Sequence, residues 1–114
     1  MHELSIAMEI LDIVEREAQN HGAGQVTDIR LRIGDLSGVE TDSLRFCFEA
    51  VRGEKMVTRH AELTIVRVPV RIRCGPCDDE FEGEGRLLRC PSCGGLDTEL
   101  LEGDELNIID FEVE

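Results

Sequence analysis

Two cysteine pairs with identical spacing constrain the fold of this chain more than any other feature. The first pair lies in "CGPC" (Cys74 and Cys77) and the second in "CPSC" (Cys90 and Cys93), with twelve residues between the pairs. A C-x₂-C turn places two thiolates on one tetrahedral ion, and a second turn completes a four-thiolate site. We therefore expect one metal ion to be bound by all four side chains.

The segment that carries these cysteines has little apolar core of its own. Its large apolar residues are Phe81, Leu87 and Leu88, whereas a structural zinc ion contributes on the order of 10–16 kcal/mol to the folding of a small module. Four protein ligands leave no open position for a substrate, so the site is expected to be structural rather than catalytic. The sequence thus favours a zinc ribbon.

The cysteines also allow two other interpretations. A rubredoxin-like iron centre uses similar turns and would make the chain an electron carrier, which the colour of the protein would reveal. The "CGPC" sequence also matches the thioredoxin redox pair, but a βαβ context is missing and a second pair is present to complete a metal site. Zinc remains the expected ion.

Hydrophobic periodicity outlines an α/β chain ahead of the cysteines. Residues 4–18 carry apolar side chains at helical spacing, and "VTDIRLRIG" (26–34) alternates as a strand with one buried face. Thr41, with Asp42 and Ser43, offers an N-cap for a second helix. We expect these two helices to pack on a small mixed sheet.

Two β-rich segments flank the cysteines. The stretch 61–74 alternates with a change of phase near Pro69, which we attribute to a bulge or an edge position, and residues 106–114 form a final strand. If both pair with the strand at 26–34, the cysteine unit is an insertion in an α/β (α+β) fold. The expected domains are residues 1–69 plus 105–114 and a zinc ribbon at 70–104.

Charge and composition limit the partners. With 12 basic and 25 acidic residues the formal net charge is −13, and the chain has four Phe but no Trp or Tyr. Such a chain repels phosphate backbones and lacks platforms for base stacking, which opposes the alternative of a zinc-ribbon adaptor for nucleic acid or transcription machinery. No signal peptide or membrane span is apparent, so we expect a soluble cytoplasmic protein. The sequence shows neither a nucleophile paired with a base nor a glycine-rich phosphate loop, so we do not expect an enzyme.

The amino terminus forms a second candidate metal site. The Met1 amine and the His2 amide nitrogen close a five-membered chelate, and the same amide nitrogen closes a six-membered one with the His2 imidazole. Three nitrogens in one plane suit Ni(II) or Cu(II) and do not suit tetrahedral zinc. A fourth ligand could come from Glu3 or from a residue nearby in space, for which Glu40 is the candidate.

Three segments together carry a family resemblance. The opening "MHELSIAMEI", the stretch "IGDLSGVETDSLRFCFE" (33–49) and the spaced cysteine pairs resemble the HypA family of hydrogenase nickel incorporation proteins over the whole chain. The resemblance implies nickel ligands at Met1 (its amine) and His2. Glu3 matches a residue that ligates or supports the site, and Glu40 matches an acidic position implicated in some relatives.

The same resemblance implies a function. It implies a nickel metallochaperone, not an enzyme, that carries Ni(II) as cargo in the α/β domain and Zn(II) as a structural ion on the four cysteines. The implied partners are a HypB-type GTPase and the large subunit of [NiFe]-hydrogenase. The sequence leaves open whether the chain forms a homodimer. Unlike some relatives, it has no histidine beside the cysteine pairs.

Overall fold

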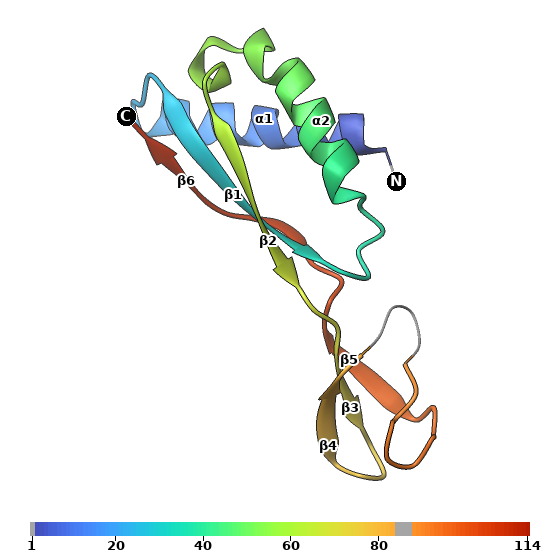
Figure 1. Cartoon of the computed structure of the whole chain (residues 1–114). Coiled ribbons are helices and arrows are strands. Elements are labelled where there is room, and N and C mark those ends of the chain that lie inside the picture. The colour runs from blue at the N-terminus through green and yellow to red at the C-terminus, as the bar shows by residue number, and fades with distance from the viewer. Residues whose placement is uncertain (1, 84–87) are drawn as a thin grey trace. The chain divides into compact units, whose positions relative to one another are not determined.

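The computed structural model in Figure 1 describes residues 2–83 and 88–114. Within these residues two α-helices and two short 3₁₀ segments accompany six strands. In chain order they are α1 (Glu3–Asn20), β1 (Val26–Gly34), α2 (Thr41–Val51), the 3₁₀ segments Arg52–Glu54 and Met56–Thr58, β2 (Glu62–Val68), β3 (Arg71–Cys74), β4 (Asp79–Glu82), β5 (Thr98–Glu102) and β6 (Leu106–Val113). The expected α/β class is confirmed.

The strands form two three-stranded sheets, ordered β2-β1-β6 and β4-β3-β5. The chain divides into two compact units: the first contains Met1–Leu31, Val39–Val66 and Asn107–Glu114, and the second contains Arg32–Gly38 and Arg67–Leu106. We call them the helical unit and the ribbon unit. Within the described residues, no helix is both long and apolar enough to cross a membrane.

The helical unit has a conventional apolar core. In β1, Ile29 and Leu31 are buried and Arg30 between them is not, as the alternation predicts for a sheet with one covered face. Leu11 of α1 and Phe48 of α2 are also buried and supply the helical side of this core. Burial of these side chains supports the expected arrangement of two helices and a small sheet.

The ribbon unit is built on β3, which pairs antiparallel with β4 and with β5. Cys74, the last residue of β3, stands opposite Asp79 of β4 and Thr98 of β5. The buried apolar side chains of the ribbon unit include Val70 and Ile72, together with those of Cys74 and Cys90. The first candidate metal ligand, Cys74, therefore lies at the end of the central strand of this sheet.

The loop that follows β1 forms main-chain hydrogen bonds with Val68, at the end of β2, and with Gly103, directly after β5. Asp35 N–H donates to the Val68 carbonyl (3.0 Å) and Leu36 N–H donates to the Gly103 carbonyl (2.6 Å). Gly34 lies so close to Gly103 that a Cβ at position 34 would come within 2.1 Å of the Gly103 carbonyl atoms. Glycine is required at position 34 because backbone occupies the space of a side chain.

Two local expectations are corrected. The stretch 61–74 is not one strand with a bulge: it is β2 and β3, which belong to different sheets and are separated at Pro69 and Val70. Proline lacks the N–H that would continue the ladder, so the phase change marks a break. The N-cap of α2 is Glu40, not Thr41, and its carboxylate accepts from the Asp42 N–H.

Candidate metal centres

The four cysteine sulfurs converge in the ribbon unit. Any two of the four lie within 4.8 Å of each other, with 3.7 Å between the sulfurs of Cys74 and Cys93 and 4.0 Å between those of Cys77 and Cys90. A tetrahedral zinc ion with Zn–S bonds of about 2.3 Å separates its sulfurs by about 3.8 Å. The donor set and its spacing therefore fit a four-thiolate zinc ion.

The two turns that present the cysteines have the same backbone design. Asp78 N–H donates to the Cys74 carbonyl and Gly94 N–H to the Cys90 carbonyl, each at 2.8 Å. Both donors directly follow the second cysteine of their pair, and both are left-handed, with φ of 55° and 70°. Glycine adopts this conformation freely, and aspartate tolerates it better than most residues do. The repeated spacing in the sequence thus becomes a repeated turn.

Backbone donors increase the acidity of the Cys90 thiol. The N–H groups of Cys93 and Ser92 directed at its sulfur lower the pKa of the Cys90 thiol to about 7, against the opposing effect of burial. Hydrogen bonding with Cys93 and Cys74, together with burial, raises the pKa of the Cys77 thiol to about 12. A metal ion must displace protons from such a cluster, so its binding is linked to pH.

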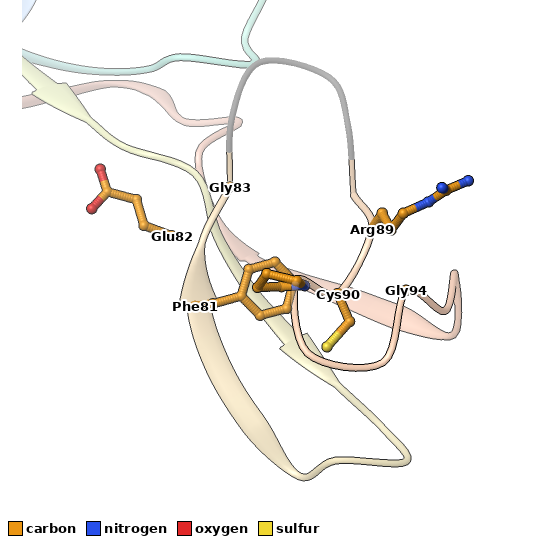
Figure 2. Close-up of a pocket in the computed structure, with 7 residues that line it drawn as sticks. Phe81, Glu82, Gly83, Arg89, Cys90 and Gly94 are labelled. Carbon is orange, nitrogen blue, oxygen red and sulfur yellow. The ribbon is translucent and has the colours of Figure 1, made fainter.

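A surface pocket lies beside Cys90 and has a volume of about 430 Å³. Figure 2 shows its lining: Phe81 stands next to the Cys90 turn, while the side chains of Glu82 and Arg89 extend away from it in opposite directions. A substrate site typically has a few polar groups that converge on the ligand. The charged side chains of this pocket diverge, and we assign it no chemical role.

The structure brings Glu3 and Glu40 together at the amino ends of the two helices. The Glu40 N–H donates to Oε2 of Glu3 over 3.2 Å, and this N–H lowers the pKa of the Glu3 carboxyl below its ordinary value. His2, at the N-cap of α1, is exposed, and its carbonyl accepts the Ile6 N–H at 3.1 Å. Met1 lies outside the described residues, as does Leu87.

Sequence reasoning missed two features near these centres. Glu40 was expected only as a nickel ligand, and its capping role was missed because glutamate is not among the preferred N-cap residues. The left-handed Asp78 was also missed. Alignment of the two cysteine pairs would have revealed it, because Asp78 occupies the position that Gly94 holds in the second pair.

The fold and the site define a class: a small α/β metal-binding protein with a four-cysteine, zinc-ribbon type of centre. Residues 1–113 match the family model described as "Hydrogenase/urease nickel incorporation, metallochaperone, hypA". The chain belongs to the HypA family, and as a member it is a nickel metallochaperone of hydrogenase maturation. The resemblance drawn from its sequence is thereby confirmed, and the nucleic-acid adaptor is not supported.

Individual relatives agree with this assignment. The chain is 46% identical to the hydrogenase maturation factor HypA of Streptomyces avermitilis, covering 96% of this chain and 84% of the relative. It is 40% identical to that of Geobacter metallireducens over the full length of both. The solution structure of the Ni metallochaperone HypA from Helicobacter pylori shares the fold, with a TM-score of 0.70, 24% identity and coverage of 99% and 97%.

Proposed function

We propose that this chain binds one Ni(II) ion at its amino terminus and delivers it during the maturation of [NiFe]-hydrogenase. The observation that carries the proposal is the exposed His2 directly ahead of an anchored Glu3, in a chain of the nickel-incorporation family. The Met1 amine, the His2 amide nitrogen and the His2 imidazole would form two fused chelate rings in one plane. The sequence offers Glu3 and Glu40 as candidates for the remaining position, but each carboxylate already accepts a main-chain N–H, which favours a supporting role for both.

Exposure of His2 suits a chaperone. A cargo ion must leave for the next protein, so its ligands have to be reachable by an incoming ligand set. Nitrogen donors in a plane favour Ni(II) and Cu(II) over zinc by geometry, whereas the four thiolates of the ribbon favour zinc. The two centres thus differ in donor type, which keeps the cargo ion apart from the structural ion.

We assign the two metal ions to different domains, with the boundaries expected from the sequence. Residues 1–69 with 105–114 form the nickel-binding domain, and residues 70–104 form the zinc-ribbon domain, with Zn(II) held by Cys74, Cys77, Cys90 and Cys93. The partners would be a HypB-type GTPase, which performs any nucleotide hydrolysis, and the large subunit of [NiFe]-hydrogenase. The chain itself would not be an enzyme and would work in the cytoplasm.

A nickel titration tests the proposal. Zinc-loaded protein with its native amino terminus is titrated with Ni(II) by calorimetry and absorbance, and compared with a copy extended by Gly-Ser ahead of Met1. The native form should bind one nickel ion with a planar-type spectrum, and the extension should abolish it because the terminal amine is displaced. Equal binding by both forms would place the nickel site elsewhere. His21→Ala, a change at the far end of α1, serves as the control and should leave binding unchanged.

A further inference from the structure

The carboxylate of Glu3 is engaged in a contact within the protein itself. Its Oε2 accepts the main-chain N–H of Glu40, 37 positions further along the chain. We call this contact the Glu3–Glu40 clip. It joins the first residue of α1 to the residue that caps α2, and both residues belong to the helical unit.

The donor of the clip is fixed by its own helix. The Glu40 carbonyl accepts the Leu44 N–H at 2.9 Å, the first bond of α2, and the Glu40 carboxylate accepts the Asp42 N–H at 3.4 Å. Main chain and side chain of Glu40 are therefore both committed to the start of α2. Its N–H is held in place by the first turn of α2, and Oε1 of its carboxylate is directed at the Asp42 N–H.

The acceptor of the clip stands directly behind the proposed nickel ligands. Chain termini are commonly disordered unless they are tied down, and ligands that must be ordered on binding lose affinity to the entropy of ordering. Because Glu3 is bonded to Glu40, the chain is anchored one residue after His2. The clip thus limits the freedom of the segment that must wrap a metal ion.

We propose, on the basis of the nickel site proposed above, that the Glu3 carboxylate is a positioning group that holds the Met1–His2 chelate in place through the Glu40 N–H, and that it is not itself a nickel ligand. The role requires an acceptor oxygen at position 3 and an N–H at position 40. It requires neither a negative charge at position 3 nor a carboxylate at position 40.

Paired variants separate positioning from ligation. Glu3→Gln keeps an acceptor oxygen and removes the carboxylate, whereas Glu3→Ala removes both. Glu40→Pro removes the N–H donor, and the φ of −83° at this position is near the range that proline adopts. Glu40→Ala keeps the N–H and is its matched control.

Nickel affinity is measured on the zinc-loaded full chain with its native amino terminus, by competition with a colorimetric chelator, alongside the nickel absorption spectrum. Glu3→Ala and Glu40→Pro should each weaken binding roughly three- to tenfold, the range of one exposed hydrogen bond. Glu3→Gln and Glu40→Ala should bind like the wild type, and all five spectra should be the same. The double variant Glu3→Ala with Glu40→Pro should be no weaker than either single change, because both break one contact.

Two results would overturn the proposal. If Glu3→Gln weakens binding as much as Glu3→Ala and alters the spectrum, the carboxylate is a ligand. If no variant changes the affinity, the terminus needs no anchor.

The metal-free protein gives a separate readout. In its NMR spectrum the Glu40 amide proton should shift in Glu3→Ala and not in Glu3→Gln, and the His2 amide should become more mobile only when the clip is broken. If the wild type binds no nickel while these shifts occur, the clip exists and the proposed function has failed. If the shifts are missing while nickel binds at the terminus, the clip alone has failed.

Discussion

The helical unit and the ribbon unit differ in what holds them together. Among the described residues, the helical unit buries apolar side chains from both helices and β1, including Leu11, Leu31 and Phe48. Among the described residues of the ribbon unit, the fully buried aliphatic side chains are Ile33, Val70 and Ile72. At about 1.5–3 kcal/mol for each buried side chain, these three provide roughly 5–9 kcal/mol.

A structural zinc ion exceeds that contribution. Zinc in small modules supplies on the order of 10–16 kcal/mol at neutral pH, more than the aliphatic core of the ribbon unit. The two units therefore respond to different disturbances: loss of metal should affect one and loss of apolar contacts the other. A zinc ion on the four cysteines would account for a second unit with so little core in a chain of 114 residues.

Removal of zinc should have the largest effect. With the metal extracted by a strong chelator under reducing conditions, the amide signals of residues 70–83 and 88–104 should collapse toward random-coil positions in the NMR spectrum, because the thiolates no longer cross-link the two turns. Signals from the core of the helical unit, such as Leu31 and Phe48, should stay dispersed. Collapse of both sets would show that the helical unit also depends on the metal.

Phe48→Ala should have the next largest effect, and it should destabilise the helical unit. The side chain is 1% exposed, and Phe→Ala in a core typically costs about 3–5 kcal/mol. Urea unfolding of the zinc-loaded protein measures the change, with zinc content determined in parallel. The control is Phe46→Ala on the same helix, 74% exposed, where a change within about 0.5 kcal/mol is expected. Loss of zinc from Phe48→Ala while the protein remains folded would contradict the comparison.

Gly34→Ala tests the close contact between the end of β1 and Gly103. A Cβ at this position would stand 2.1 Å from the Gly103 carbonyl carbon and oxygen, and backbone cannot yield as a flexible side chain does. Gly34→Ala should therefore destabilise the protein by about 1–3 kcal/mol, the usual cost of overpacking. Gly24→Ala, with no atom within 4 Å and an ordinary φ, is the matched control and should be neutral or slightly stabilising in the same urea experiment. Equal effects of the two changes would contradict the close approach seen here.

Much of the fold could be predicted because strong local patterns determine it. The residues 26–34 alternate so regularly that β1 occupies the expected range, and the helical spacing of residues 4–18 lies inside the observed α1. The equal spacing of the cysteines likewise predicted that their sulfurs would converge. For the helix and the strand neighbouring residues carry the whole signal, and for the cysteines the repeated spacing carries it.

What the sequence did not reveal depends on contacts between distant residues. The close approach of Gly34 and Gly103 joins positions 69 apart, and a glycine after a strand is equally typical of a simple turn. The contact between Glu3 and the Glu40 N–H uses a main-chain donor, which carries no sequence signature. At Pro69, a bulge and a break give the same change of phase, and only the pairing of β3 with β4 and β5 distinguishes them.

The smallest expected effect concerns an ion pair on the sheet of the helical unit. Arg30 Nη2 lies 2.5 Å from Oδ2 of Asp110, with both side chains nearly half exposed, and the hydrogen bond from Arg30 lowers the pKa of the Asp110 carboxyl. A carboxyl whose pKa is lower in the folded state stabilises the protein above its unfolded pKa, and that contribution is lost as the pH falls through the folded pKa. Solvent screening keeps it small.

Titration of the Asp110 carboxyl carbon by NMR, in wild type and in Arg30→Gln, measures this effect. The midpoint should lie below the ordinary value of 3.8 in the wild type and should rise when the guanidinium is removed. Arg32→Gln, the same change two residues along β1, is the control and should leave the midpoint in place.

Zinc should be lost on acidification through protonation of its thiolates, and that loss should not change in Arg30→Gln, because the ion pair and the metal belong to different units. A shift of the zinc-release midpoint in Arg30→Gln would mean that the sheet of the helical unit and the metal of the ribbon unit are energetically linked.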